Sequence, residues 1–540
     1  MRKAPRFWGR DAAVLTMEKG REQAVMRYPN GISHVFPGGK DLQYALQFTN
    51  LNNPIPLTPY QIFWLLPPFA LFTLAFGGIV VPKLNLILEL ICRDYYSEKG
   101  IEQSTKWVPS LSDHGELQCQ TNEVSSRTSL FILYGNLCSG LLSAITSPKL
   151  GALSDRYGRK GILILNTAGM LIGEVLTILA AKYPDTFDVN WILVGYALDG
   201  LCGSFIVGMA LAHSYAVDCT PPGKRNVTFG YFHACLFTGI AAGPILAGKV
   251  IKATKNVLSV FYIAIGAHVF FIIFLAFFIP ESLSKSRQRA ARETHRAEME
   301  RLGPTADWIN QLRSINLLAP LKILYPTGRG SSPALRRNLI LLAAVDTIMF
   351  GIAMGAMGVL IIYTNLQFGW GNWETSKYVS IVNSARVLVL VLGLPLATRM
   401  IRGKEGTYVQ RHSGSDLFDL TVIRIAVFFD MLGFLGYTLS RSGPLFTLSG
   451  VVASIGGLGS PTLGAALTKH VPADRTGQLL GATGLLHAIA RVIGPTVFNG
   501  IYYATVGKFR QTVFACLTGT FLVAFFASWF VQPHGECNCF

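Results

Sequence analysis

The sequence predicts an all-helical polytopic membrane protein, and two observations on composition and apolar runs support this prediction. The chain has 540 residues, of which 51% are hydrophobic and only 14% are charged, and its mean hydropathy is +0.40. Soluble globular proteins carry about 25% charged residues. Apolar runs of roughly 18 or more residues recur along the chain, and each is long enough to cross a hydrocarbon core of about 30 Å as a helix. An intrinsically disordered chain, a disulfide-stapled mini-fold, a coiled coil and a cytosolic enzyme are thereby excluded.

Twelve apolar segments are predicted to cross the membrane as helices, because backbone N–H and C=O groups in lipid must find partners within the chain. The first six cover residues 62–82, 129–149, 162–181, 190–216, 227–250 and 257–279. The second six cover residues 338–363, 378–398, 420–439, 444–467, 478–504 and 512–531. We therefore expect two six-helix bundles, at residues 62–280 and 338–532, joined by a basic central loop at residues 281–337. An N-terminal tail at residues 1–61 precedes them, and a C-terminal tail at residues 533–540 follows.

The basic balance of the chain has a simple explanation in a membrane protein. The formal net charge is +17, a value that otherwise suggests a nucleic-acid partner. Cytoplasmic loops of membrane proteins carry an excess of Lys and Arg. With the N-terminus in the cytoplasm, 31 of the 47 Lys and Arg residues fall in cytoplasmic segments and 13 fall outside. We therefore expect both termini in the cytoplasm, a plasma-membrane location with the vacuolar membrane as the alternative, and no nucleic-acid partner.

The most specific string in the chain is GALSDRYGRK, residues 151–160, between the second and third predicted spans. Gly151 and Gly158 give backbone freedom to a short link between helices. An acid, Asp155, lies among basic residues that include Arg156 and Arg159. Because the N-terminus of a helix favours an anion, Asp155 can lie at such a terminus and leave Arg159 free to pair with another carboxylate. A basic turn alone explains the cations but neither the acid nor the glycines.

This string resembles the signature of the loop between spans 2 and 3 in the major facilitator superfamily, G-x-L-x-D-R-x-G-R-K. Two further segments look like the same family: SYAVDCTPPGKR after the fourth span, and Pro280-Glu281-Ser282 after the sixth. The resemblance implies the major facilitator fold, with two six-helix bundles around a central cavity. It also implies that charge pairs close a cytoplasmic gate, with Arg159 pairing with Asp218 or Glu281. The implied gating residues are Gly151, Asp155, Arg156, Gly158, Arg159, Asp218, Arg225 and Glu281.

The fifth predicted span carries a stripe of small residues. Gly239, Gly243 and Ala247 recur every four residues and form one smooth face, which lets another helix approach closely. Pro244 removes a backbone hydrogen bond and permits a bend. The full set of Gly230, Gly239, Gly243, Pro244 and Gly248 resembles the antiporter motif of drug-proton exchangers in the superfamily, with Ala247 in place of one of its final glycines. Ordinary small-residue packing is the alternative explanation.

Several ionisable side chains lie inside the predicted spans, where their cost makes each a functional candidate. A carboxylate there couples transport to a proton gradient if it binds and releases a proton as its surroundings alternate between dry and wet. Asp199 is the first choice, because Gly200 and Gly203 beside it leave space for a ligand or water. Pairing between helices is the alternative role. The proton-coupling or substrate-binding candidates are Asp199, Glu174, Asp346, Arg386, His487 and Arg491. Arg424 and Asp430, in contrast, are expected near helix ends, where they reach the membrane surface.

One departure from the family limits what the resemblance implies. Drug-proton exchangers often carry an arginine in the fourth span, three residues before a Gln-Gly pair. Here Tyr196 stands where that arginine would be, and Asp199 stands in place of the glutamine. The mechanism assigned through that arginine is therefore not carried over. The chain looks closer to the tetracycline-resistance-like and folate-transporter-like branches, which include uptake symporters.

The nine cysteines and the remaining motifs point to no metal, cofactor or enzymatic activity. Cys92 and Cys119 flank the large loop after the first span, which the topology places outside, where an oxidising environment favours a disulfide. No cysteine pair has zinc spacing, and no histidine-rich cluster accompanies them. The sequence contains no Walker string and no nucleophile elbow.

These observations predict a proton-coupled secondary transporter that exports a drug-like or natural-product organic molecule by alternating access. The expected partners are a small organic substrate, protons and the lipid bilayer, and the chain is expected to be monomeric. Aromatic residues make up 11% of the chain, which suits an amphipathic solute. Two alternatives remain open. One is uptake of a small organic nutrient or anion together with protons, and the other is a sensor of the same fold that binds a solute without moving it.

Overall fold

A computed structural model describes residues 14–17, 23–27, 33–37, 60–98, 122–302, 319–327, 332–370, 372–402, 414–505 and 508–533. The chain divides into two compact units, Met1–Thr58 and Pro59–Phe540.

The first unit contains a small antiparallel sheet. Its strands are β1 (Val14–Met17), β2 (Gln23–Arg27) and β3 (Ser33–Pro37), in the order β1-β2-β3. Leu15 pairs with Met26, and Val25 pairs with Val35. The sequence predicted only a polar tail here, because strands of four and five residues give too short an alternation to stand out from polar surroundings.

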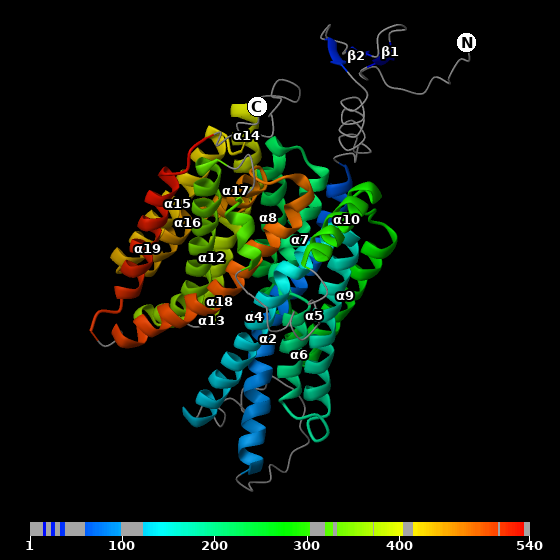
Figure 1. Cartoon of the computed structure of the whole chain (residues 1–540). Coiled ribbons are helices and arrows are strands. Elements are labelled where there is room, and N and C mark those ends of the chain that lie inside the picture. The colour runs from blue at the N-terminus through cyan, green and yellow to red at the C-terminus, as the bar shows by residue number, and fades with distance from the viewer. Residues whose placement is uncertain are drawn as a thin grey trace. The chain divides into compact units, whose positions relative to one another are not determined.

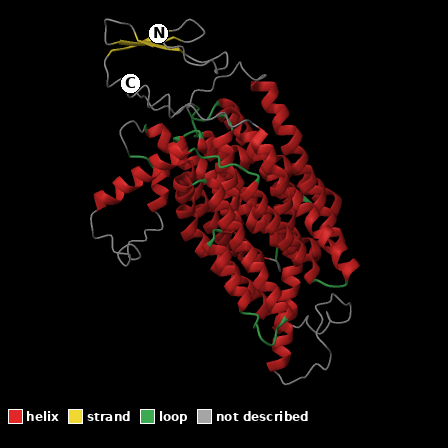
Figure 2. Cartoon of the chain, turned by 90° about the vertical axis from the view of Figure 1, so that its right-hand side faces the viewer, coloured by secondary structure: helices red, strands yellow, loops and turns green. Residues whose placement is uncertain are grey.

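The second unit is helical, and its first half, called here the N half, runs from α2 to α9. Figure 2 shows the helices of this unit side by side, with their long axes roughly aligned. The elements of the N half are α2 (Tyr60–Glu98), α4 (Asn122–Tyr157), α5 (Arg159–Lys182), α6 (Trp191–Leu201), α7 (Ser204–Cys219), η1 (Pro222–Lys224), α8 (Arg225–Thr254) and α9 (Leu258–Phe277). The segment that follows contains α10 (Lys285–Leu302) and η2 (Ala319–Leu324).

The second half, called here the C half, runs from α12 to α19. Its elements are α12 (Pro333–Phe368), α13 (Asn372–Leu388), η3 (Val389–Gly393), α14 (Leu394–Arg402), α15 (Leu417–Leu439), α16 (Gly443–Ala453), η4 (Ser454–Leu458), α17 (Gly459–Thr468), η5 (Ala473–Arg475), α18 (Thr476–Thr505) and α19 (Thr512–Trp529). In Figure 1 the labels of α5, α6 and α9 lie on one side of the helical unit and those of α15, α16 and α19 on the other.

Three of the predicted spans are interrupted. The fourth span consists of α6 and α7, which are separated at Cys202 and Gly203, where Gly203 has φ +96° and Ser204 has φ +54°. The eighth contains the π-helical turn η3 between α13 and α14, and the tenth contains the 3₁₀ turn η4 between α16 and α17. Interruptions of this kind in membrane helices are tolerated where neighbouring helices cover the freed backbone groups.

Eleven segments of the described residues are long and apolar enough to cross a membrane, with each interrupted span counted once. The remaining predicted span is α15, a 23-residue helix that carries Asp419, Arg424 and Asp430. It packs against α16, α17 and α19 within the C half. The helices therefore correspond in order to the twelve predicted spans.

The two halves meet mainly along four helix pairs, in which α18 packs against α4 and α7, and α8 packs against α13 and α17. Between described residues, the hydrogen bonds that join the halves run from the ends of these helices to their middle. None reaches beyond Ala241 on α8 or Arg491 on α18, although these helices continue to Thr254 and Thr505. We call the end at which these bonds gather the charged end, since it carries Asp155, Arg159, Asp218, Glu281, Asp416 and Lys469.

Candidate transport site

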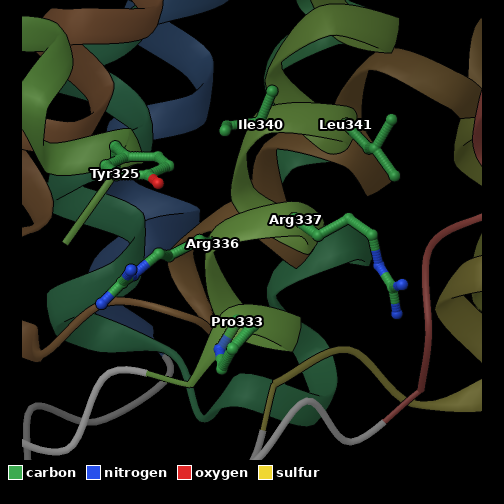
Figure 3. A pocket seen from close by; sticks show the side chains of 6 residues that line it. All are labelled: Tyr325, Pro333, Arg336, Arg337, Ile340 and Leu341. Atoms are coloured by element: carbon green, nitrogen blue, oxygen red, sulfur yellow. The ribbon is translucent and has the colours of Figure 1, made fainter. Parts of the chain in front are cut away.

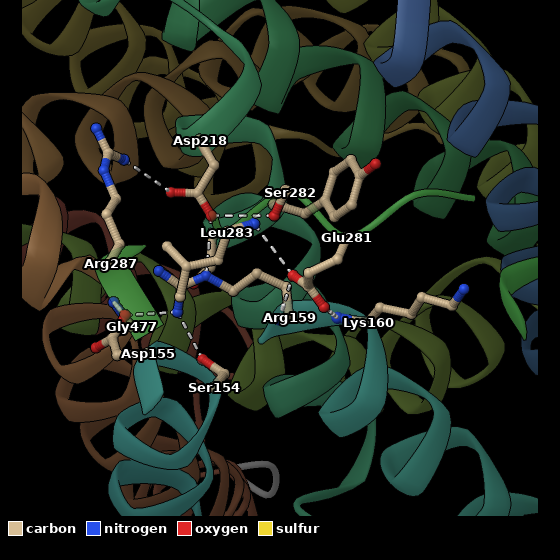
Figure 4. Close-up of polar contacts among 12 residues, drawn as sticks. Ser154, Asp155, Arg159, Lys160, Asp218, Glu281, Ser282, Leu283, Arg287 and Gly477 are labelled. Atoms are coloured by element: carbon tan, nitrogen blue, oxygen red, sulfur yellow. Dashed lines mark hydrogen bonds and ion pairs between the residues drawn. The ribbon is translucent and has the colours of Figure 1, made fainter. Parts of the chain in front are cut away.

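At the charged end, Arg159 is the centre of a buried cluster of opposite charges (Figure 4). Its guanidinium donates to Asp218, with Nε 3.0 Å from Oδ2, and its Nη1 lies 2.6 Å from Oδ1 of Asp155. Ser282 donates to the same Asp218 oxygen, and Arg287 of α10 approaches its other oxygen at 3.9 Å. Charge-assisted hydrogen bonds of this kind are about twice as strong as neutral ones.

Glu281 accepts hydrogen bonds from the first turn of α5. The backbone N–H groups of Arg159 and Lys160 donate to its two carboxylate oxygens at 2.8 and 3.1 Å. The carboxylate thus satisfies orphan donors at a helix N-terminus, where the macrodipole favours an anion. Gly158, at φ +104°, makes the turn before α5, and a Cβ there would collide with Glu281. Glu281 therefore binds the backbone of Arg159, while Asp218 binds its side chain.

Asp155 connects the two halves. Its carboxylate accepts from the backbone N–H groups of Gly477 and Gln478, at 3.0 and 2.9 Å, in the first turn of α18. Gly151 lies one turn earlier on α4, and a Cβ there would collide with the Gly477 carbonyl. The predicted helix-terminus role of Asp155 thus falls on α18, a helix of the other half.

Two arginines of the predicted gating set lie apart from the Arg159 cluster. Arg225, at the start of α8, donates to the carbonyl and hydroxyl of Thr468, at 3.1 and 3.3 Å, and so also joins the halves. Arg156 is half-buried and forms no ion pair with a described residue.

A second charged cluster lies in the C half, and the sequence analysis missed it. Arg402 lies 2.7 Å from Asp416 and 2.9 Å from Asp419, and Lys469 forms an ion pair with the other oxygen of Asp419. Arg402 also donates to the carbonyl of Gly223 in the N half. The signal was present: Asp416 and Asp419 flank the start of an apolar run, at the spacing of an N-cap and the third helical residue. Asp416 accepts from the backbone N–H of Asp419 at 3.0 Å.

Burial and partners act in opposite directions on the charges just outside α15 and α17. Burial acts to raise the pKa of the Asp416 carboxyl, but Lys469, the hydrogen bonds from Asp419 and the charge of Arg402 together hold that pKa below its ordinary value. Burial lowers the pKa of Lys469 despite the nearby Asp419 carboxylate. The lowered pKa keeps the Asp416 carboxyl ionised at neutral pH.

Ionisable side chains also lie deep in the bundle. Asp346 of α12 lies 2.9 Å from His487 of α18, and Phe350 stacks on this imidazole with ring centroids 4.3 Å apart. Asp199 accepts from Ser139 at 3.0 Å, and Arg491 lies 3.5 Å from the Ser204 hydroxyl. The structure thus places Asp199 and Arg491 in different halves and brings Asp346 and His487 together.

Glu174 has a different environment from the other candidates. It lies 2.8 Å from Nδ1 of His268, and both side chains are buried between α5 and α9, inside the N half. The second oxygen of Glu174 and Nε2 of His268 have no hydrogen-bond partner. Glu174 therefore lies away from the contact between the halves.

Comparison with known proteins identifies the family. Residues 126–495 match the Major Facilitator Superfamily. "MFS-type transporter avaJ" of Aspergillus versicolor is 32% identical over 472 residues, which cover 85% of this chain and 87% of that protein. The chain belongs to the major facilitator superfamily.

More distant relatives of this facilitator include proteins named as folate transporters and as tetracycline resistance proteins. A proton-coupled folate transporter of Rattus norvegicus is 22% identical over 74% of this chain and 78% of its own length. A class G tetracycline resistance protein of Vibrio anguillarum is 26% identical over 70% and 83%. The crystal structure of the human organic anion transporter MFSD10 (TETRAN) superposes with a TM-score of 0.63 at 19% identity, covering 87% of this chain and 99% of that one.

These comparisons confirm the predicted family, the all-helical major facilitator fold and the prediction that the chain is not an enzyme. The facilitator is an integral membrane protein of many spans and a secondary transporter by family. Proteins of this superfamily bind small solutes, often with coupled protons.

The small-residue stripe of the facilitator's α8 lies against α2. A Cβ at Gly239 would collide with the Thr73 carbonyl, and one at Gly243 would lie 2.5 Å from the Gly78 nitrogen. Gly230 instead faces Leu394 of the C half, and an added Cβ at Gly248 meets nothing within 4 Å. Pro244 lies within α8, which continues to Thr254. The motif therefore packs within the N half at two of its glycines and between the halves at a third.

Two remaining features of the facilitator lie outside this site. Cys92 is buried and disulfide-bonded, and Cys119 lies outside the described residues. A shallow hollow of about 340 Å³ lies at the start of α12, lined by Tyr325, Pro333, Arg336, Arg337, Ile340 and Leu341. Figure 3 shows Arg336 and Arg337 pointing away from each other there. None of the candidate ionisable groups lines this hollow.

Among the described residues, no group of three or more His, Cys, Asp and Glu side chains is arranged to hold a metal.

Proposed function

We propose that this facilitator is a proton-coupled secondary active transporter that exports a drug-like or natural-product organic molecule by alternating access. In this proposal it is a monomer of the plasma membrane with both termini in the cytoplasm, and the charged end faces the cytoplasm. The substrate binds near the middle of the membrane between the two halves. The observation that carries the proposal is the hydrogen bonding of Asp155 to α18 of the other half, within the buried Arg159 cluster.

The Arg159 cluster has the properties required of a gate. The side chains of Arg159, Asp155 and Asp218 are buried, and removing one partner of such a pair costs about 3–5 kcal/mol, because a charge is left buried without compensation. When whole groups separate into water, the same charges are solvated. The cluster can therefore hold the halves together in one state and open as a unit in the other.

A proton site in the middle of the bundle links this movement to a pH gradient. Asp199 is the first choice, since it faces a single hydroxyl donor, Ser139, and is half-buried rather than sealed. Asp346 follows, with a hydrogen bond to His487. Glu174 ranks below Asp199 and Asp346 as a proton site, because it is bonded to His268 inside one half.

Export has support from the relatives and from the interior of the bundle. Named relatives include tetracycline resistance proteins, and a structural neighbour is an organic anion transporter. Aromatic rings line the N half close to α7, with Phe76 and Phe205 stacked at 4.4 Å between ring centroids. Such rings suit a solute with an apolar body.

Proton-coupled uptake of a small organic anion is the second candidate. Arg386 and Arg491 lie within spans, at half-buried positions, and neither forms an ion pair with a described residue. Unpaired arginines at membrane depth suit a carboxylate-bearing solute. The proton-coupled folate transporters among the relatives support the same candidate.

Purified protein in liposomes with an imposed pH gradient tests the function. A panel of labelled organic acids, amines and neutral amphiphiles serves as the probe set, and empty liposomes serve as the control. Solute movement opposite to the proton flow supports export by exchange, and movement with the proton flow supports the second candidate. Tight binding without flux indicates a sensor and contradicts both.

Asp199→Asn tests the choice of proton site in the same assay. The expected result is solute flux that no longer responds to the pH gradient but persists when the solute gradient alone drives it. Unchanged pH dependence moves the site to another carboxylate.

A further inference from the structure

Asp430 is a buried carboxylate that the proposed transport cycle does not yet use. The sequence placed it near a helix end, and this was wrong: α15 runs from Leu417 to Leu439, so Asp430 lies in its middle. Its side chain is only 6% exposed. It forms no hydrogen bond, and no ion pair within 4.0 Å, with a described residue. A carboxylate without partners at this depth is costly when charged.

Arg386 is the charged group that acts on Asp430. Both side chains pack against the same 3₁₀ turn, η4, at adjacent glycines. A Cβ at Gly456 would collide with the Asp430 carboxylate, and a Cβ at Gly457 would lie 2.5 Å from Cγ of Arg386. The π-helical turn η3 begins three residues after Arg386. Two backbone irregularities therefore surround one acid and one base, and such turns are frequent at functional sites.

Within the part of the chain that the structure describes, no other charge faces Asp430 from the elements packed on α15. The segments η4, α16, α17 and α19 contain no charged residue. The phenols of Tyr378 on α13 and Tyr437 on α15 bond each other at 2.6 Å. Asp346, the acid of α12, is bonded to His487. Asp430 thus depends on Arg386 for charge compensation.

The guanidinium of Arg386 also reaches the other half. Its Cζ lies 4.9 Å from the ring centroid of Phe237, on α8, which is within the range of a cation–π contact. Its Nε is buried without a hydrogen-bond partner. Nearby, Ser380 of α13 donates to the Ala241 carbonyl of α8 at 3.3 Å. Arg386 therefore lies between an acid of its own half and an aromatic ring of the other.

We propose that Asp430 is a proton-binding site whose affinity is set by Arg386, and that Phe237 makes the position of Arg386 depend on the arrangement of the two halves. This inference rests on the proposed transport function and extends its proton coupling. While α8 and α13 are in contact, the ring holds the guanidinium beyond ion-pair distance, and Asp430 keeps its proton. When the halves separate here, Arg386 moves onto Asp430, the carboxylate is stabilised, and its O–H bond breaks to release a proton to water.

Two measurements on the full chain test this inference, and one of them needs no substrate. In detergent, a titration with a pH-indicator dye counts the protons bound. Asp430→Asn is expected to bind one proton fewer than the wild type between pH 4 and pH 9, and Asp430→Glu is expected to bind the wild-type number. In liposomes, Asp430→Asn is expected to lose the flux driven by a pH gradient while keeping flux driven by solute alone.

Substitutions around the pair separate its role from general damage. Gly456→Ala forces the carboxylate from its place and is expected to weaken the pH response, whereas Gly500→Ala, in open space, is the matched control. Phe237→Leu frees Arg386 and is expected to lower the pH midpoint of flux by about half a unit. Phe526→Leu, on the exposed face of α19, is its control and is expected to change nothing.

The outcomes distinguish this inference from the proposed function. A wild-type proton count and wild-type pH dependence in Asp430→Asn overturn the inference, and transport itself stands. If Asp430→Asn binds one proton fewer but the wild-type protein moves no solute, Asp430 remains a proton site and the transport function is overturned. An unshifted midpoint in Phe237→Leu overturns the role of the ring.

Discussion

The two charged clusters at the same end of the bundle use similar chemistry in different ways. In the N half, one buried arginine, Arg159, has Asp155 and Asp218 as side-chain partners, and Asp155 bonds the first turn of α18 across the interface. In the C half, two cations, Arg402 and Lys469, share Asp416 and Asp419, and the bond across the interface comes from Arg402. The N-half cluster thus depends on a single cation and crosses with an acid, whereas the C-half cluster has two cations and crosses with a base.

This difference indicates that the two clusters are unequally sensitive to the loss of one cation. Removing Arg159 leaves two buried acids with no strong cation, since Arg287 is 3.9 Å from one oxygen of Asp218 and half-buried. Removing Arg402 leaves Lys469 in place. We therefore expect the N-half cluster to decide whether the end closes, and the C-half cluster to adjust how firmly it closes.

Arg159→Ala is expected to give the largest effect. The loss of the only fully buried cation of the cluster is expected to cost about 3–5 kcal/mol in the closed state, because two carboxylates remain buried without it. Flux in liposomes is expected to fall more than about 100-fold, while the amount of protein in the membrane is unchanged. Arg156→Ala, at a half-buried position without an ion pair, is the control. Wild-type flux in Arg159→Ala would remove the gating role.

Arg402→Ala is expected to give an intermediate effect. Lys469 continues to compensate Asp419, so the cost is about 1.5–3 kcal/mol, the range for a hydrogen bond to a charged group. Flux is expected to fall about tenfold. A loss as severe as that of Arg159→Ala contradicts the asymmetry between the clusters. The double variant Arg402→Ala with Lys469→Met sharpens the comparison, because it should approach the severity of Arg159→Ala.

Asp155→Asn is expected to give a smaller effect. Gly477 and Gln478 donate to different oxygens of Asp155, so the single amide oxygen of asparagine keeps only one of these two bonds. The other bond and the negative charge at the α18 N-terminus are lost, at a cost of about 1–2 kcal/mol. Spin labels at Tyr157→Cys and Gln478→Cys, both exposed, report the distance between the halves at this end. The long-distance fraction is expected to rise about fivefold. The reference is the distance distribution of the same labelled pair with Asp155 intact. If Asp155→Asn leaves this distribution unchanged, the Asp155 bonds to α18 do not link the halves.

Acid is expected to give the smallest effect, through Asp416. Because its folded-state pKa is held below the unfolded value, Asp416 stabilises the fold above its unfolded pKa of about 3.9, and this contribution is lost as pH falls through the folded pKa. The melting temperature should therefore drop between about pH 5 and pH 3, and Asp416→Asn should drop less. An equal drop in both proteins assigns the acid sensitivity to other carboxylates.

The same comparison shows what sequence can reveal in this protein. Residues 151–160 are contiguous, so their acid, cations and glycines form a readable string, and Asp218 and Glu281 follow from family resemblance. In the C-half cluster, the spacing of Asp416 and Asp419 is a local signal, but Arg402 and Lys469 are separated by two spans, α15 and the interrupted α16–α17. No local spacing joins all four residues. Spans and their order follow from hydropathy, because lipid imposes a minimum length. Which face each helix turns inward depends on packing. For this reason the sequence placed Asp430 incorrectly near a helix end and named Glu174 without its partner His268.

The break in the fourth span has a consequence for how the chain is made. At the break, Asn166 of α5 donates to the carbonyls of Cys202 and Ser204, at 2.8 and 2.9 Å. Neither α6, with 11 residues, nor α7, with 16, is long enough to cross a bilayer alone. During biosynthesis the fourth segment therefore reaches lipid with uncovered carbonyls unless the third is already beside it. We expect the third and fourth segments to leave the translocation channel together, as a helical hairpin stabilised by the hydrogen bonds of Asn166.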